Sequence, residues 1–430
     1  MRDPEAPSLV RLPEHVVLEI LARVPGVADL FRCAAARKRW RNLVTEPSFL
    51  RRRWPEGACH CSSLVGFLGR ERRQGGEGPP GSSFVRAPWS VLGPGRPLLG
   101  SFVPGAAGLL DDRVVPLASH RGALLVRFGA EAEAEAEAES GPAVDRLAVC
   151  NLLSGACHVL PPLRCDWFFD YFGTSAHAVL TGADCCPDDG QRQALDPASF
   201  KVLVVGVSDD RRRYVLRTFS SGEPGWSAPS ECFDPVERGI FGPFKRRSAV
   251  VSHGTAHWVL WDLVKFHVLD VNAANRHASL QELQTPPPAG DLALYESPHL
   301  SVAPNKAATL SSLCLSSQDP QVEIWTRQDG GKGSDEDCGG DWRRDRVVEM
   351  TPEQNQIVDR PRCMCTGDRS GTLLITDRCR CMYILHLESG AMEEVTDHLH
   401  GLRDYKTAMA VEIDWPAFFV CRLLGGKAHV

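Results

Sequence analysis

This sequence of 430 residues is short of long apolar runs and of strong net charge. No run reaches the roughly eighteen apolar residues of a membrane-spanning helix. Residues 1–11 lack the apolar core of a secretory signal. The net charge is only −6, which argues against bulk electrostatic binding to nucleic acid or to an anionic membrane. We therefore expect a soluble intracellular protein that binds neither nucleic acid nor membrane.

The sequence also lacks the short motifs of several enzyme classes. It has no G-x-S-x-G nucleophile elbow, no G-x-x-x-x-G-K-[ST] phosphate loop and no H-E-x-x-H metal-binding pair. His253, His257 and His267 cluster along one hairpin-like stretch. These histidines could line a binding site, but ordinary core or surface positions are the favoured interpretation. We expect no catalytic residue and no cofactor.

Cysteine, in contrast, is abundant, with 16 residues. Without a secretory signal, and with many of the cysteines in apolar segments, reduced thiols are expected. One set has a paired spacing: Cys363, Cys365, Cys379 and Cys381. Four thiolates could hold zinc. However, a C-x-C spacing in a strand only places both side chains on one face, and structural zinc sites favour longer spacings. These four cysteines are weak zinc candidates, and no metal is expected.

Most of the chain, from Phe84 onward, consists of short β-prone runs bounded by Gly, Pro, Asp or Ser. These runs repeat. Asn151, Asp270 and Glu388 mark polar turns that lie 119 and 118 residues apart. Between them, two further units end near Trp226 and Trp342, which are 116 residues apart. Alternating units of about 59 residues indicate a β-propeller, which is built of repeated four-stranded blades.

The repeat length predicts five to six blades. Five blades are visible, at about 113–163, 168–230, 247–288, 299–349 and 360–398. The ends of this region, 84–104 and 405–425, are expected to supply strands that close the ring. A pair of β-sandwiches or another β-rich domain remains the alternative.

The first 54 residues have a different, helical pattern. The apolar residues at helical spacing in the first predicted helix are Val16, Val17, Ile20, Leu21 and Val24. The second predicted helix carries Leu30, Cys33, Trp40, Leu43 and Val44. A short third turn holds Phe49, Leu50 and Trp54. Three short helices cannot bury a self-sufficient core, so we expect the remaining apolar surface to dock onto another protein.

This N-terminal segment resembles the F-box family. The matching motifs are Leu12-Pro13, the segment 19–25, Asp29-Leu30 and the basic run 37–41, about a tenth of the chain in all. Ala36-Arg37 stands where the family usually has a Val-Cys pair. Further motifs, in the β-prone region, resemble those of plant F-box-associated, kelch-like propellers. They are the polar turns, Gly254-x-x-His257-Trp258 and Leu160-Pro161-Pro162.

The resemblance implies a multidomain α plus all-β chain. A small three-helix F-box is expected at 8–54, a linker at 55–83 and a β-propeller-like F-box-associated domain of about five to six blades at 84–426. Two segments are expected to be flexible loops, 130–141 and 329–341. The first alternates Ala and Glu, and the like charges of the glutamates at every second position repel in an extended strand. The second is rich in Gly and acidic residues.

By the same resemblance, the chain is a non-catalytic substrate-recognition subunit of a cullin-based, SCF-type ubiquitin ligase. The F-box is expected to dock to a Skp-type adaptor and, through it, to a cullin, while the propeller binds an unidentified substrate protein. The expected location is the cytoplasm, the nucleus or both. The residues assigned to the adaptor-docking face are Leu12, Pro13, Val16, Val17, Ile20, Leu21, Val24, Leu30 and Trp40. Two alternatives stay open: an F-box scaffold outside a ligase, and a propeller enzyme that binds a small molecule.

Overall fold

The computed structural model divides the chain into two compact units, which are treated separately below. One unit contains residues 1–56 and 415–430, and the other contains residues 57–414. The structure describes residues 12–55, 58–72, 84–91, 103, 114–128, 143–165, 175–184, 199–208, 213–233, 244, 246, 248–262, 265–283, 298–302, 309–316, 321–328, 342–352 and 358–424. The predicted flexible loops at 130–141 and 329–341 lie outside these residues.

The first unit is helical. Its elements are α1 (Glu14–Ala22), α2 (Val27–Ala36), α3 (Lys38–Val44), α4 (Pro47–Arg53) and α7 (Trp415–Leu424). The second helix expected from the sequence is divided at Arg37, whose backbone is extended at φ −142° and ψ 129°. The Arg37 guanidinium lies over the Trp40 ring, 5.2 Å from its centroid, which holds this junction. Within the described chain, no helix is long and apolar enough to cross a membrane.

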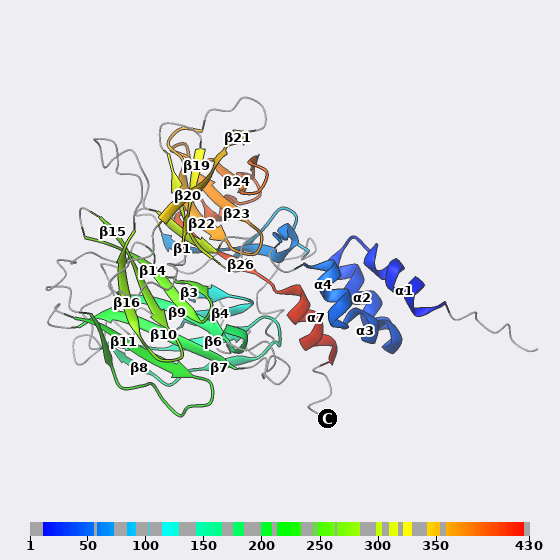
Figure 1. Ribbon diagram of the computed structural model, residues 1–430, viewed down its shortest axis with the longest axis horizontal. Coiled ribbons are helices and arrows are strands. Elements are labelled where there is room, and N and C mark those ends of the chain that lie inside the picture. Colours follow the sequence, from blue (N-terminus) through cyan, green and yellow to red (C-terminus); the bar gives the residue numbers. More distant parts are fainter. Residues whose placement is uncertain are drawn as a thin grey trace, which may run out of the picture. The chain divides into compact units, whose positions relative to one another are not determined.

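The C-terminal helix α7 packs against α2 and against Trp54, the residue that follows α4 (Figure 1). Phe419 contacts Phe31 and Trp54, with ring centroids 5.5 Å apart in both pairs. The expectation that this end of the chain forms a closing strand is wrong for residues 415–424. Their buried residues are Trp415, Phe419 and Leu423, and this four-residue spacing is helical, not alternating. The helix α7 therefore covers part of the apolar surface that the N-terminal helices leave over.

The second unit is a six-bladed β-propeller. Blade 1 contains β3 (Val115–His120), β4 (Ala123–Arg127), β6 (Leu147–Asn151) and β7 (Cys157–Val159). Blade 2 contains β9 (Ser175–Thr181), β10 (Phe200–Val207), β11 (Tyr214–Ser220) and β12 (Ser230–Phe233). Blade 3 contains β13 (Val250–Ser252), β14 (Thr255–Trp261), β15 (Phe266–Asn272) and β16 (Ala278–Glu282).

The remaining three blades complete the ring. Blade 4 contains β17 (His299–Val302), β18 (Leu310–Leu315), β19 (Gln321–Arg327) and β20 (Trp342–Glu349). Blade 5 contains β22 (Arg362–Gly367), β23 (Thr372–Thr376), β24 (Met382–His386) and β25 (Ala391–Glu394), with β21 (Thr351–Pro352) at its edge. Blade 6 contains β1 (Leu64–Arg72), β2 (Phe84–Arg86) and β26 (Tyr405–Glu412). A separate pair joins β5 (Ala143–Asp145) to β8 (Leu163–Cys165). The five blade positions predicted from the repeat are confirmed.

Blade 6 is closed by the two ends of the propeller chain, because β26 pairs with β1 in antiparallel fashion. Strand β1 lies inside the segment predicted as a linker. Leu64, Val65, Phe67 and Leu68 are all buried, so apolar burial fixes this strand although Gly- and Pro-rich sequence follows it. The strand expected near residue 405 is present as β26.

The core of the propeller lies between the blades. One apolar cluster combines blades 1 and 2, and others combine blades 2 and 3, 3 and 4, 4 and 5, and 5 and 6. Trp258, 1% exposed, is among the largest buried side chains of the cluster between blades 2 and 3. Each blade is therefore held by its neighbours as well as by its own hydrogen bonds.

Blades 1, 3 and 5 share one backbone signature. In each, the backbone N–H of the residue that follows the third strand donates to the carbonyl of a glycine in the turn between the first two strands. These bonds are Leu152 to Gly122, Ala273 to Gly254 and Leu387 to Gly371, at 2.8–2.9 Å. These bonds make Asn151, Asn272 and His386 equivalent. The predicted repeat is real, but its markers Asp270 and Glu388 are each two residues away from the equivalent position. Different polar residues fit this turn, so the residue types alone did not define its register.

Candidate functional site

The first candidate surface is the exposed apolar part of the helical unit. Leu12 and Ile20 are 47% and 53% exposed, and Pro13 is also exposed. Val16, Val24 and Trp40 are half-buried. These six predicted docking residues are at least partly accessible on this unit.

The other three predicted docking residues form the core of the helical unit itself. Val17, Leu21 and Leu30 are 5%, 2% and 0% exposed. They can support the docking face from beneath but cannot touch a partner. The resemblance to the F-box assigns all nine residues to one docking face, because sequence motifs identify apolar positions without showing which of them the unit covers with its own helices.

Two arginines fix the backbone on either side of α1: Arg39, from the basic run 37–41, and Arg53, which the sequence analysis did not single out. Arg39 donates to the Leu12 carbonyl at 2.8 Å. Arg53 donates to the Val24 and Pro25 carbonyls after the helix, both at 2.9 Å. It also donates to the carbonyl of Ala22, the last residue of α1, at 3.3 Å, and so satisfies a carbonyl that the helix end leaves without a helical partner. These bonds join residues at least 27 positions apart in the chain, so no local sequence signal reveals them.

Charged residues lie on the exposed side of α1. Glu19 pairs with Arg52 at 2.9 Å and with Arg23 at 3.3 Å. The hydrogen bond and the charge of Arg52 hold the pKa of Glu19 below its ordinary value. The exposed Ile20 therefore shares its helix with a charged group that is already paired.

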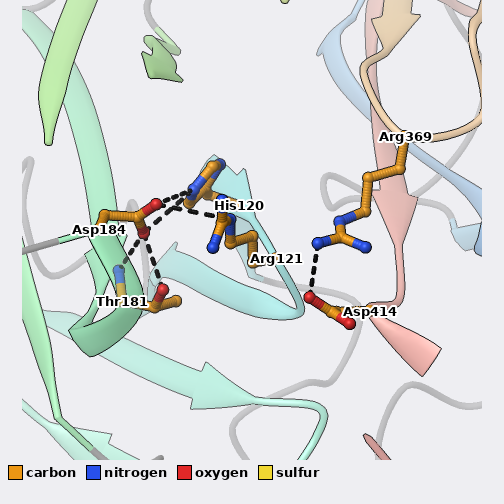
Figure 2. A network of polar contacts seen from close by, with 6 residues as sticks. All are labelled: His120, Arg121, Thr181, Asp184, Arg369 and Asp414. Carbon is orange, nitrogen blue, oxygen red and sulfur yellow. Dashed lines mark hydrogen bonds and ion pairs between the residues drawn. The ribbon is translucent and has the colours of Figure 1, made fainter. Parts of the chain in front are cut away.

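The second candidate is a polar cluster on the propeller (Figure 2). His120 is the last residue of β3 and Arg121 follows it in the turn to β4, and both point at Asp184, which follows β9 in the next blade. The distances to the carboxylate are 3.1 Å from His120 Nε2 and 3.4 Å from Arg121 Nε. The Thr181 N–H and hydroxyl donate to the same carboxylate at 2.9 and 2.7 Å.

These contacts tie blade 1 to blade 2. Burial alone would raise the pKa of Asp184, but His120, Arg121 and the Thr181 hydroxyl outweigh it and hold the pKa well below its usual range. The carboxylate is therefore charged and fully occupied by its partners. Such a group stabilises a junction and is poorly suited to abstract a proton.

A related set of contacts joins blades 4, 5 and 6. Arg369 donates to Asp414 at 2.5 Å (Figure 2). The carboxylate of Glu412 accepts the N–H groups of Arg369 and Ser370 at 2.9 and 2.8 Å.

Asp368 belongs to the same set but is not a simple ion pair. Its carboxylate accepts the Ser301 hydroxyl of blade 4 at 3.1 Å. Burial, followed by the nearby charge of Glu412, raises the pKa of Asp368 to about 6. Asp368 is thus a carboxyl group of the propeller that titrates near neutrality.

A third arrangement combines a serine, a histidine and an aspartate in blade 3. His257 Nε2 lies 3.0 Å from the Ser252 hydroxyl, and His257 Nδ1 lies 2.6 Å from Asp270. Arg327 of blade 4 donates to the other Asp270 oxygen at 2.5 Å. Burial would raise the pKa of Asp270, but His257 and Arg327 lower it below its ordinary value.

This array has the hydrogen-bond order of a hydrolase triad, but it lies below the surface, with His257 1% and Ser252 8% exposed. The sequence missed it because its members come from different strands. The three histidines considered together in the sequence are separate: His253 is exposed at a turn and His267 lies 2.8 Å from Asp262.

The four cysteines considered for zinc do not gather. Cys363 lies in the cluster between blades 4 and 5, whereas Cys365 lies in the cluster between blades 5 and 6. The expectation that the C-x-C spacing places both on one face is wrong, because the pairing register shifts between them. Cys379 is exposed and Cys381 half-buried. Across the described ranges, no group of three or more His, Cys, Asp or Glu residues is placed to hold a metal ion.

Comparison with known proteins adds little to this geometry. No family model and no curated protein matches the sequence. A GH93 α-L-arabinofuranosidase of Fusarium graminearum, solved with arabinobiose, is 8% identical, with 65% of this chain and 79% of that chain covered and a TM-score of 0.32.

Two further solved structures are similar to a comparable degree. A prolyl endopeptidase is 11% identical, with 89% of this chain and 53% of that chain covered and a TM-score of 0.34. The Dos1 propeller is 11% identical, with coverages of 64% and 57% and a TM-score of 0.29. Similarities at this level identify no function, and the six-bladed ring rests on the strand pairing described above.

Proposed function

We propose that this protein is a non-catalytic substrate receptor of a cullin-based ubiquitin ligase. The helical unit docks onto a Skp-type adaptor, and the propeller binds the substrate protein. The observation that carries this proposal is the exposure of Leu12 and Ile20, at 47% and 53%, in the segment that resembles the F-box. A helical unit this small that leaves large apolar side chains exposed has apolar surface available for a partner to cover.

The backbone around these residues supports the same interpretation. Arg39 donates to the carbonyl of Leu12, and Arg53 donates to the carbonyls that follow α1. These hydrogen bonds restrain the backbone from which the exposed side chains project. A preorganised surface loses little conformational freedom on binding. The buried residues Val17 and Leu21 anchor the same helix from its inner side.

The proposed mechanism is proximity. The adaptor and cullin place a partner enzyme's ubiquitin thioester near the propeller, and the propeller holds the target so that its lysines reach the thioester. This raises the effective concentration of the reacting groups without any catalytic residue in this chain.

Co-purification of the full chain with a Skp-type adaptor and a cullin tests the proposal. We expect Leu12→Ala combined with Pro13→Ala to abolish capture, because both residues lie on the exposed face. The matched control is Val159→Ala, which removes a side chain that is 60% exposed on β7 of the propeller, and should leave capture unchanged. Unchanged capture by the double variant would refute the docking assignment. Capture of the adaptor without cullin or ubiquitin transfer would instead support a scaffold outside a ligase.

The hydrogen-bond order of the Ser252–His257–Asp270 array suggests a second candidate function, hydrolysis. Its burial and the Arg327 contact fit a link between blades 3 and 4 better than an active site, because an acyl substrate needs access to the serine hydroxyl. A fluorophosphonate probe decides between the two. Labelling of the native chain that is lost in Ser252→Ala would support the hydrolase, and an unlabelled native chain would support the structural role.

A further inference from the structure

Two cysteines that the proposed function does not use face each other in blade 1. The sulfur atoms of Cys150, on β6, and Cys157, on the outer strand β7, are 3.3 Å apart. Both are free thiols. Adjacent strands therefore place two reducing groups next to each other.

The strand register makes this pair suitable for a covalent bond. The Asn151 N–H donates to the Ala156 carbonyl, and the Leu160 N–H donates to the Leu147 carbonyl, both at 2.8 Å. These bonds make Cys150 and Cys157 a non-hydrogen-bonded pair, in which opposite Cα atoms are about 4.5 Å apart. That spacing lies within the range of about 4.4–6.8 Å found in disulfides, so a bond can form without moving the backbone.

The two thiols differ in exposure and in acidity. Cys150 is 0% exposed, whereas Cys157 is half-buried on the edge strand, where a small oxidant can reach it. A hydrogen bond from the Cys150 thiol lowers the pKa of Cys157, and the same contact, with burial, raises the pKa of Cys150. Cys157 is thus the thiol that reacts first, and Cys150 is the one held ready beside it.

We propose that Cys150 and Cys157 form a reversible oxidation site that hydrogen peroxide converts into a cross-strand disulfide. The Cys157 thiolate attacks one peroxide oxygen, the O–O bond breaks, and after protonation the products are a Cys157 sulfenic acid and water. The Cys150 sulfur then attacks the Cys157 sulfur, the S–O bond breaks, and a second water leaves with the Cys150 proton. Overall, two thiols are oxidised and one peroxide is reduced to two waters.

The disulfide would fasten the edge strand β7 to β6 and so protect the outer edge of blade 1. Closing a short loop restricts the unfolded chain, so the oxidised protein should melt a few degrees above the reduced protein. A dithiol reductant restores the two thiols and the lower melting temperature.

Peptide mapping of the full-length protein tests the proposal, because trypsin leaves both cysteines in one peptide, 147–164. The protein is treated with hydrogen peroxide, alkylated with iodoacetamide and digested. We expect this peptide to be unalkylated and lighter by two hydrogen atoms, and dithiothreitol to reverse the change. Cys61 and Cys379, which are exposed, report in the same sample whether the oxidant was active.

Two single variants assign the roles. In Cys150→Ser, oxidation should stop at the Cys157 sulfenic acid, which dimedone traps. In Cys157→Ser, Cys150 should stay reduced and alkylatable after denaturation. The proposal fails if both thiols of the native protein remain alkylatable while Cys61 and Cys379 are oxidised. It also fails if Cys157 pairs with a cysteine other than Cys150. The map of the native protein decides the question even if a variant does not fold.

Discussion

Each of the two units brings its own first and last elements together, yet the units differ in how completely they bury their apolar side chains. In the propeller, β26 returns to β1, and apolar clusters fill the spaces between neighbouring blades. In the helical unit, α7 returns to α2 and to the residue after α4, but Leu12, Ile20, Val420 and Leu424 stay exposed.

The difference shows which unit is complete on its own. Within the described ranges, four of the seven exposed large apolar residues belong to the helical unit, although it is much the smaller of the two. A ring of blades can bury each sheet against the next, whereas a few short helices have too little interior to do so. The helical unit therefore has surface to offer a partner, which is what an adaptor-docking role requires.

The largest effect is expected where the ends of the helical unit meet. Phe419 is fully buried and packs against Phe31 and Trp54. Phe419→Ala should cost about 3–5 kcal/mol, since it removes a buried ring and leaves a cavity. Hydrogen exchange followed by mass spectrometry should show lost protection in α2 and α4 and unchanged protection in β1 and β26.

The neighbouring residue supplies the control for this variant. Val420 is 37% exposed, so Val420→Ala should change stability by no more than about 0.5 kcal/mol. If Phe419→Ala reduced protection equally in the propeller strands, the two units would not be separate folding units, and the comparison above would fail.

A smaller, pH-dependent effect is expected in the propeller. Asp368 has a pKa of about 6 in the folded chain and about 4 when unfolded, so its charged form is disfavoured by folding. This penalty is fully present above pH 6, shrinks as pH falls from 6 to 4, and is absent below that range. Asp368→Asn removes it and should stabilise the protein by about 2–3 kcal/mol at pH 8 and by little at pH 4. Urea unfolding across this pH range measures the difference.

Asp184 provides the opposite case in the same polar region. Its pKa is lowered in the folded chain, so its charged form contributes stability that is present above pH 4 and is lost as pH falls further. Asp184→Asn should therefore destabilise the protein at neutral pH. The assignment of these two carboxyl groups would be wrong if both variants shifted stability in the same direction at pH 8.

The sequence predicted the fold better than the site, for physical reasons. Turn residues at regular spacing mark the repeat, because blades 1, 3 and 5 share one turn geometry, and all five predicted blade positions are confirmed. The four-residue spacing of Trp415, Phe419 and Leu423 is helical, but so short an apolar run also fits a strand. The contacts that decide for the helix are with Phe31 and Trp54, which lie far away in the chain.

Site residues are harder still to predict, because burial is decided by contacts across the fold. Val17 and Ile20 belong to the same helix and the same apolar pattern, but the first is 5% exposed and the second 53%. In the same way, Ser252 and Asp270 come together only when the strands of blade 3 pair, and Arg327 reaches Asp270 only when blade 4 packs beside blade 3.

The smallest predicted effect concerns one turn of the repeated blades. Gly155, Arg276 and Gly390 each donate to a residue four positions earlier, at 2.8–2.9 Å, and all three have positive φ, at 84°, 59° and 73°. Only Arg276 carries a Cβ there, which costs about 1–2 kcal/mol in a left-handed conformation. Because glycine also adds freedom to the unfolded chain, Arg276→Gly should stabilise the protein by only about 0.5 kcal/mol.

The midpoint of urea unfolding measures this gain. The slope of the unfolding free energy against urea concentration should stay unchanged, because the folded and unfolded states keep their compactness. The matched control is the reverse change in blade 1, Gly155→Ala, which introduces a Cβ at the equivalent position and should destabilise the protein by about 1 kcal/mol. A loss of stability in Arg276→Gly would mean that the contacts of the exposed Arg276 side chain outweigh the strain. In that case the turn of blade 3 would differ in its energetics from those of blades 1 and 5, although all three share one backbone geometry.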